Sequence, residues 1–119
     1  MKILLVEDDL LLRQLYTDLL VTEKYEVSTA EDGDMAYEKM KQGGWDLVLL
    51  DMNLPGMSGL EVLRKLKSEN ITNFTKKVVF MSASGSPKDV DEMKSMSDGY
   101  FIKSELNPDE FIVKVKEYI

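Results

Sequence analysis

The sequence contains no cysteine and no histidine. Without cysteine, the chain can form neither a disulfide nor a zinc–thiolate site. Without histidine, it has no imidazole to act as a general base, as the partner of a catalytic serine or as a metal ligand. These two absences exclude thiol chemistry and serine–histidine catalysis.

Basic residues and long apolar runs are also scarce. The chain has 22 acidic against 15 basic residues, which gives a formal net charge of −7. Direct binding to nucleic acid needs a basic face, and this balance argues against one. The N-terminal apolar run Ile3–Val6 stops at three carboxylates, so it resembles neither a signal peptide nor a membrane span. We expect a soluble cytoplasmic protein that does not contact a membrane.

The length of the chain fits one compact domain. It has 119 residues, of which 44% are hydrophobic. A domain of this size buries roughly two thirds of its unfolded surface, which supports a core without disulfides. We therefore expect one domain over residues 1–119.

Short apolar segments rich in β-forming residues alternate with helical patterns along the whole chain. The segments predicted as strands are Ile3–Val6, Tyr25–Ala30, Leu47–Leu50, Val78–Met81 and Tyr100–Ile102. The second of them is more polar than the others, which predicts an edge strand. Continuous apolar runs such as Ile3–Val6 are typical of strands buried on both faces.

Helical patterns follow each predicted strand, at residues 10–20, 35–40, 60–66, 87–96 and 108–119. Asp9 is a predicted N-cap, Ser58 and Glu61 have capping-box spacing, and Asn107 precedes a proline and two acids. The predicted buried stripe of the last helix consists of Phe111, Ile112, Val115 and Ile119. Five βα repeats imply an α/β fold, with a parallel sheet and helices on both faces.

Four of the five predicted strands end in residues that can handle phosphate or metal. These residues are Glu7 and Asp8 after the first strand, Asp51 after the third, Ser82 after the fourth and Lys103 after the fifth. In an open parallel sheet, the carboxyl ends of the strands share one edge, where such folds bind ligands. If the strand order is 2-1-3-4-5, three carboxylates meet in one crevice.

Each of these residues also has a purely structural explanation. Glu7 and Asp8 could favour the positive end of the first helix, and Asp51 could cap a loop. Three carboxylates packed together repel each other, however, and burial raises that cost. A hard divalent cation such as Mg²⁺ relieves the repulsion and takes oxygen ligands. A carboxylate beside Mg²⁺ can attack a phosphoryl donor, because the metal neutralises charge on the transferring group.

With these residues in place, the chain resembles the receiver domains of two-component response regulators over essentially all of its length. The motifs that carry the resemblance are Val6–Asp9, Asp46–Gly59, Met81–Ala83 and Tyr100–Lys103. The segment Asp46–Gly59 is highly specific. The resemblance implies a doubly wound (βα)5 flavodoxin-like fold, a three-layer sandwich with sheet order 2-1-3-4-5.

By this resemblance, Asp51 accepts a phosphoryl group from phosphohistidine on a sensor histidine kinase or a histidine phosphotransfer protein. Asp8, Asp51 and the backbone carbonyl of Asn53 would ligate Mg²⁺, and Glu7 would help through water. The domain would catalyse only its own phosphorylation and dephosphorylation, so we expect a signalling phosphoacceptor and not an enzyme.

The resemblance also implies roles for residues at the last two strands. Lys103 would pair with Asp51 and then with the phosphoryl group, and Ser82 would form a hydrogen bond with a phosphoryl oxygen. Tyr100 matches the aromatic residue that turns inward when the serine moves. This movement would reshape the surface of the fourth helix, fifth strand and fifth helix, where a downstream protein target would bind.

Two features depart from the family pattern. The lysine is usually followed by a proline in a cis peptide, whereas Ser104 follows Lys103 here. A cis bond before a residue other than proline costs about 2.5–4 kcal/mol, so we predict a trans bond and an altered loop. The turn Met96–Gly99 is short and the fourth helix has few apolar residues, which predicts a mobile output surface.

Three other functions are alternatives to the signalling phosphoacceptor. A phosphohydrolase of the haloacid-dehalogenase type carries a second aspartate two residues after its nucleophile, where this chain has Asn53, and usually needs a cap domain. A flavodoxin-like FMN protein needs a phosphate loop after the first strand, and this chain has none. A degenerate receiver would bind partners without phosphorylation, although every acceptor residue is present here.

Overall fold

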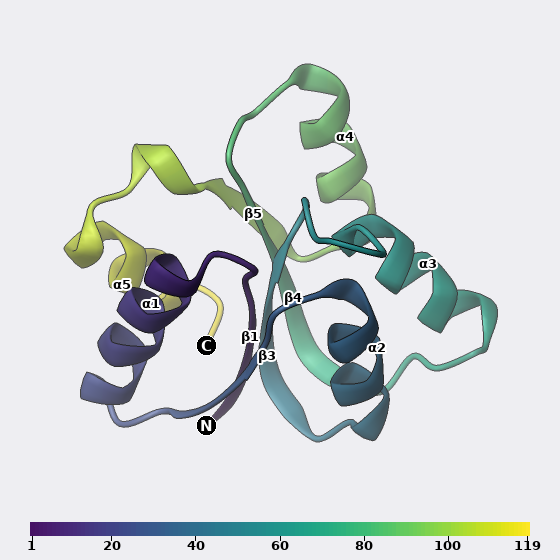
Figure 1. The fold of residues 1–119 in the computed structure, drawn as a ribbon, viewed down its shortest axis with the longest axis horizontal. Coiled ribbons are helices and arrows are strands. Elements are labelled where there is room, and N and C mark those ends of the chain that lie inside the picture. Colours follow the sequence, from purple (N-terminus) through teal and green to yellow (C-terminus); the bar gives the residue numbers. More distant parts are fainter.

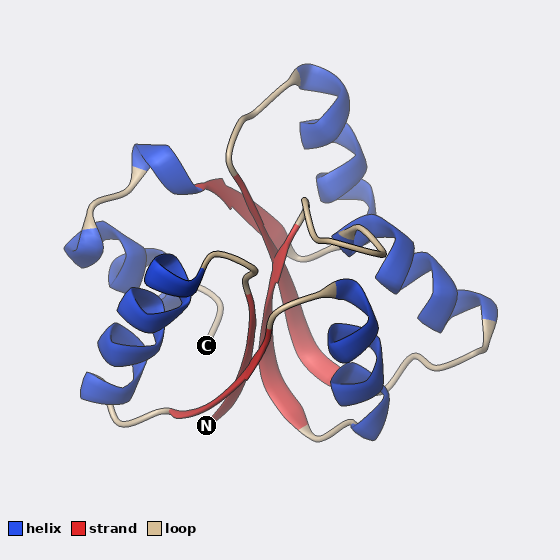
Figure 2. Cartoon of the chain, viewed as in Figure 1, coloured by secondary structure: helices blue, strands red, loops and turns tan.

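The computed structural model describes residues 1–119 as a five-stranded parallel sheet flanked by five helices (Figure 1). The strands are β1 (Lys2–Val6), β2 (Glu26–Ala30), β3 (Trp45–Asp51), β4 (Thr75–Ser82) and β5 (Gly99–Ile102). The helices are α1 (Leu10–Thr22), α2 (Gly33–Gln42), α3 (Gly59–Ser68), α4 (Pro87–Met96) and α5 (Pro108–Lys116). Each strand is followed by a helix, so the predicted fivefold βα alternation is confirmed (Figure 2).

The sheet has the strand order β2-β1-β3-β4-β5, and every neighbouring pair is parallel. The predicted order 2-1-3-4-5 is therefore confirmed, with β2 at one edge. Because the chain reverses its direction of winding between β2 and β3, the loops after β1 and β3 leave the sheet side by side. The register Val6–Leu50 places the residues that follow β1 next to the end of β3.

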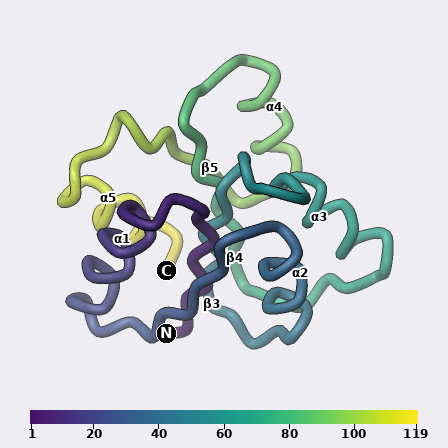
Figure 3. Tube along the Cα trace, in the orientation of Figure 1, coloured from purple at the N-terminus to yellow at the C-terminus, as the bar shows by residue number.

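The helices form one layer on each face of the sheet. In Figure 1, α1 and α5 cover one face, and α2, α3 and α4 cover the other. The first and last helices are far apart in sequence but lie side by side, as the chain trace in Figure 3 also shows. The three-layer sandwich is thus confirmed.

Alternate side chains of the central strands supply two separate cores. Ile3 and Leu5 of β1 pack in the core beneath α1 and α5, whereas Leu4 and Val6 pack in the core beneath α2, α3 and α4. All four side chains are fully buried. β1 is a continuous apolar run because helices cover both faces of the sheet at this strand.

Side-chain caps begin the helices where they were predicted. Asp9 accepts a hydrogen bond from the Leu12 amide at 3.0 Å. Asn107 and Glu110 form a reciprocal capping box at the start of α5. Ser58 accepts from the Glu61 amide at 3.2 Å, which is one half of the predicted box.

The end of α5 corrects one prediction. The helix stops at Lys116, and Ile119 is 43% exposed instead of continuing the buried stripe. Beyond Lys116 the chain no longer follows the helical period that would turn Ile119 towards the sheet. In α4, only Met93 is buried, as its sparse apolar pattern indicated. None of the helices combines the length and the apolar character that crossing a bilayer requires.

The peptide bond between Lys103 and Ser104 is trans, as predicted, because the structure has no cis peptide bond. Residues Lys103–Glu105 form one turn of 3₁₀ helix directly after β5. This turn keeps the Lys103 side chain at the carboxyl edge of the sheet, where the candidate site lies.

Candidate functional site

Asp51 is the last residue of β3 and is only 2% exposed. Its backbone is paired with β4 opposite Met81, so the strand ladder determines the position of its Cα. The amide of Asn53 donates to Asp51 Oδ1 at 3.0 Å. A buried carboxylate is thereby held at the mouth of a crevice, with one oxygen bound to the loop that follows it.

Two further carboxylates lie beside Asp51, as predicted from the strand order. One ligand oxygen each of Glu7, Asp8 and Asp51 lies within 4.8 Å of the others. Glu7 is fully buried, whereas Asp8 is exposed. The Glu7 side chain also accepts a hydrogen bond from the Asp9 amide at 3.3 Å. The cluster is therefore buried at one end and open to solvent at the other.

The ammonium group of Lys103 lies between the two buried carboxylates. Its Nζ is 2.8 Å from Asp51 Oδ2 and 2.9 Å from Glu7 Oε1. Burial alone would lower the pKa of Lys103, but the hydrogen bonds to Asp51 and Glu7 outweigh this effect and raise the pKa above its ordinary value. Lys103 is accordingly a permanent cation of the site.

The pKa of Glu7 lies well above its ordinary value. Burial first, and then the neighbouring Asp51 carboxylate, raise its pKa from 4.5 to about 7, although Lys103 pulls the pKa down. One lysine thus does not fully compensate two buried carboxylates. With all three carboxylates ionised, the cluster and Lys103 together carry a net charge of −2, which suits one divalent cation.

The cluster opens into a cavity of about 520 Å³ at the carboxyl edge of the sheet. The residues that line this acceptor cavity are Glu7, Asp8, Asp9, Leu12, Tyr16, Asp51, Asn53, Ala83, Lys103 and Ser104. Leu12 and Tyr16 form an apolar wall from α1. This wall was not predicted from the sequence, because the same spacing on α1 is explained equally well by core packing.

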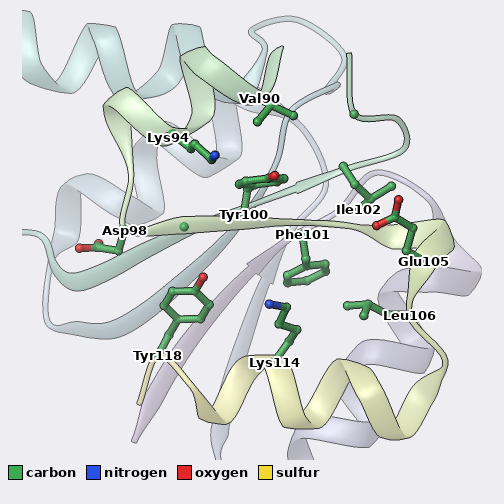
Figure 4. Close-up of a pocket in the computed structure, with 12 residues that line it drawn as sticks. Val90, Lys94, Asp98, Tyr100, Phe101, Ile102, Glu105, Leu106, Lys114 and Tyr118 are labelled. Carbon is green, nitrogen blue, oxygen red and sulfur yellow. The ribbon is translucent and has the colours of Figure 1, made fainter. Parts of the chain in front are cut away.

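Ser82 and Tyr100 are not part of this cluster. Ser82 is buried at the end of β4, but its hydroxyl donates to the backbone oxygen of Ser84 at 2.5 Å, and no hydrogen bond joins it to Asp51. Tyr100 lies on β5 and lines a different cavity, between α4 and α5 (Figure 4). The Nζ of Lys94 is 5.8 Å from the centroid of its ring.

Arg13 is a neighbour of the site that the sequence reasoning did not identify. Its Nη1 donates to the backbone oxygens of Glu7 at 2.9 Å and of Asp8 at 3.4 Å. Its Nη2 lies 3.4 Å from Glu31 Oε2. A basic residue one turn into the helix that follows an acidic pair is a weak signal, since it also suits a surface ion pair.

Five parallel strands in the order 2-1-3-4-5 with an acidic crevice at their carboxyl ends define the flavodoxin-like class of α/β proteins. The model of the family described as response regulator receiver domain matches residues 3–116. The chain therefore belongs to the receiver domain family of response regulators.

Two relatives in Bacillus subtilis illustrate the range of proteins that contain this domain. The chain is 33% identical to sporulation initiation phosphotransferase F over 120 residues, which cover 99% of this chain and 93% of that protein. It is also 33% identical to the transcriptional regulatory protein ResD over 116 residues, or 97% of this chain and 46% of ResD. The chain thus spans about half the length of ResD.

Solved structures agree with this assignment. The response regulator TrrA from Thermotoga maritima, crystallised in complex with Mg²⁺-BeF, is 36% identical and has a TM-score of 0.82, with 99% of this chain and 98% of TrrA covered. The chemotaxis protein CheY4 from Vibrio cholerae is 27% identical with a TM-score of 0.86, and the same shares of the two chains are covered.

Proposed function

We propose that Asp51 accepts a phosphoryl group from phosphohistidine on a sensor histidine kinase or a histidine phosphotransfer protein. The observation that carries this proposal is the arrangement around Asp51, a buried carboxylate between an acidic pair and a lysine at the open edge of the sheet. Membership of the receiver family supports the same role. The chain then acts as a phosphoacceptor in two-component signalling.

The donor set of the site suits Mg²⁺, because it consists of oxygens that, once all three carboxylates are ionised, carry an excess of two negative charges over Lys103. Asp8, Asp51 and the backbone carbonyl of Asn53 would hold the ion, and Glu7 would act through water. The complex of TrrA with Mg²⁺-BeF is a precedent in a related chain. When bound, the metal would neutralise charge on the transferring group.

The transfer itself needs an in-line approach to Asp51. One carboxylate oxygen of Asp51 forms a bond to phosphorus while the nitrogen–phosphorus bond of the donor breaks, and the electron pair leaves with the imidazole. Lys103 already touches the Asp51 carboxylate and can follow the negative charge onto the phosphoryl oxygens. The Ser82 hydroxyl would exchange its bond to Ser84 for one to a phosphoryl oxygen.

The surface beside the acceptor cavity suits contact with the donor protein. Leu10, Leu11 and Leu15 of α1 are 58%, 76% and 41% exposed. Exposed leucines gathered at one end of a helix favour a protein contact. Leu12, the neighbour of Leu11 in the sequence, lines the cavity that holds Asp51. A donor seated on this face would present its phosphohistidine to the cavity.

The response to phosphorylation would pass from Ser82 to Tyr100. Tyr100 stands in a cavity of about 530 Å³ between α4, β5 and α5, which leaves its ring room to move (Figure 4). A movement of Ser82 towards the phosphoryl group would vacate space beside β5 and bias Tyr100 inward. The surface of α4, β5 and α5 would then present a changed shape to a downstream protein.

The direct test is incubation with Mg²⁺ and acetyl phosphate, followed by intact mass spectrometry. We expect a mass gain of one phosphoryl group in the parent protein and none in Asp51→Asn. Absence of the gain in the parent protein would favour a degenerate receiver. Steady hydrolysis of small phosphate esters would favour a phosphohydrolase.

A further inference from the structure

The loop between β2 and α2, residues 31–32, carries none of the proposed ligands but is linked to both loops that do. One link runs through Arg13. Its guanidinium donates to the backbone oxygens of Glu7 and Asp8, and the same group pairs with Glu31. The Arg13 side chain is only 16% exposed, whereas that of Arg64, which pairs with a glutamate on the surface, is 57% exposed.

The second link runs through Gly33, the first residue of α2. Its amide donates to the backbone oxygen of Pro55 at 3.2 Å, in the loop that also contains Asn53. A Cβ atom on Gly33 would lie 2.2 Å from the backbone oxygen of Met57 and 2.7 Å from the Met57 Cβ. Contacts this short with backbone atoms force one of the two segments to move.

We propose that Arg13 and Gly33 are positioning residues, which use the loop between β2 and α2 to set the spacing of the two ligand-bearing loops. This inference rests on the proposed Mg²⁺ site. Mg²⁺ demands nearly ideal octahedral geometry with short bonds to oxygen, so a small displacement of either loop weakens its binding. Groups that orient metal ligands without touching the metal are worth about 10–100-fold in affinity.

The direction of the change in Mg²⁺ affinity on removing Arg13 distinguishes a positioning role from a purely electrostatic one. The positive charge of Arg13 lies near the proposed Mg²⁺ site. If Arg13 acted only through its charge, it would repel Mg²⁺, and its removal would strengthen metal binding. As a clamp on the Glu7 and Asp8 carbonyls, it holds the Asp8 carboxylate towards Asp51, and its removal would weaken metal binding. The two roles predict opposite changes.

The first experiment compares Arg13→Met with Arg64→Met, which removes an arginine–glutamate pair that does not line the acceptor cavity. Mg²⁺ alone is titrated into each protein and followed by two-dimensional NMR, and thermal unfolding is measured without metal. We expect Arg13→Met to bind Mg²⁺ about tenfold more weakly than the parent protein, and Arg64→Met to bind it equally well. Glu31→Gln, which keeps the carbonyl contacts, is expected to fall between the parent protein and Arg13→Met.

The second experiment uses Gly33→Ala, with Gly99→Ala as its control. A Cβ on Gly99 also clashes, with the Tyr118 side chain, but touches neither ligand-bearing loop. We expect Gly33→Ala to bind Mg²⁺ about tenfold more weakly than the parent protein and Gly99→Ala to bind it as tightly as the parent protein does, with the unfolding temperature of each variant measured alongside.

Unchanged or stronger Mg²⁺ binding in Arg13→Met would overturn the positioning role of Arg13, and Glu31→Gln identical to the parent protein would overturn its link to the loop. Equal losses in the two glycine variants would overturn the role of Gly33. These results leave the proposed function intact if the parent protein binds Mg²⁺ and is phosphorylated. A parent protein that does neither would refute the proposed function itself.

Discussion

Replacing Glu7 by glutamine removes one buried negative charge from the acceptor site while keeping the shape of the side chain. Glu7 is fully buried and shares Lys103 with Asp51. Its pKa is raised to about 7 because burial and the Asp51 carboxylate disfavour its charged form. In the metal-free protein, the folded chain therefore favours the protonated, neutral form of Glu7 more than the unfolded chain does.

The magnitude follows from the difference between the folded and unfolded pKa values. The folded chain binds the Glu7 proton more tightly than the unfolded chain, so the free energy of unfolding falls as pH rises between 4.5 and about 7. One pKa unit corresponds to about 1.4 kcal/mol, which gives a total of about 3 kcal/mol. This stability is fully present below pH 4.5 and is lost once the pH exceeds the folded pKa.

The assay is urea unfolding of the parent protein and Glu7→Gln from pH 4.5 to pH 8 in a chelator, followed by the fluorescence of Trp45. Trp45 is the only tryptophan and is 5% exposed, so its emission reports unfolding. From pH 4.5 to pH 8 the parent protein is expected to lose about 3 kcal/mol of unfolding free energy relative to Glu7→Gln, because only the parent protein has an ionisable group at this position. Glu92→Gln, which removes a carboxylate from an ion pair outside the acceptor cavity, is measured alongside as the control.

A difference between Glu7→Gln and the parent protein that stays constant with pH would refute this reasoning. It would mean that Glu7 titrates alike in the folded and unfolded chain, and that Lys103 compensates both buried carboxylates. Saturating Mg²⁺ is expected to reduce the shift, because a cation beside the cluster favours the ionised carboxylates. The same urea series repeated with Mg²⁺ measures this reduction.

Three further predictions concern the acceptor, its lysine and the core. Asp51→Asn should lower the pKa of Glu7, because the neighbouring carboxylate helps to raise it; NMR titration of the Glu7 carboxyl carbon measures this, and an unchanged pKa would contradict it. Lys103→Met leaves two buried carboxylates without a cation, so the free energy of unfolding in urea should fall by about 3–5 kcal/mol at pH 8 and by less at pH 5. An equal loss at both pH values would argue against an ionic origin of the effect. Phe111→Ala removes a buried ring whose centroid is 4.3 Å from that of the stacked Tyr16 ring, and calorimetry should show a loss of about 3–5 kcal/mol in the free energy of unfolding. A loss below about 1 kcal/mol would mean that neighbouring side chains fill the space left by the ring.

The elements of this fold that repeat a strong local pattern could be predicted from sequence. β1 and β3 are continuous apolar runs because helices cover both faces of the sheet. The start of α5 was predicted from Asn107, because its capping box is encoded within four residues. The end of α5 was not, since no glycine marks it and the position of Ile119 depends on where the last turn unwinds.

Part of the candidate site could be predicted from sequence, and part of it could not. That Glu7, Asp8, Asp51 and Lys103 follow strand ends is visible in the sequence, and parallel topology brings strand ends to one edge. The role of Arg13 was not visible, because its partners are backbone oxygens and a glutamate on another loop. Contacts of this kind have no periodicity from which to infer them.

The sequence by itself determined the order of strands and helices, the acidic and basic residues at the strand ends and the absence of thiol and imidazole chemistry. Only the tertiary structure decided which carboxylate is fully buried, that Lys103 lies between Glu7 and Asp51, and that Ser82 and Tyr100 stand apart from them. The physical reason is that hydrophobic period and capping act over a few residues, whereas burial and charge pairing depend on strands that meet across the sheet.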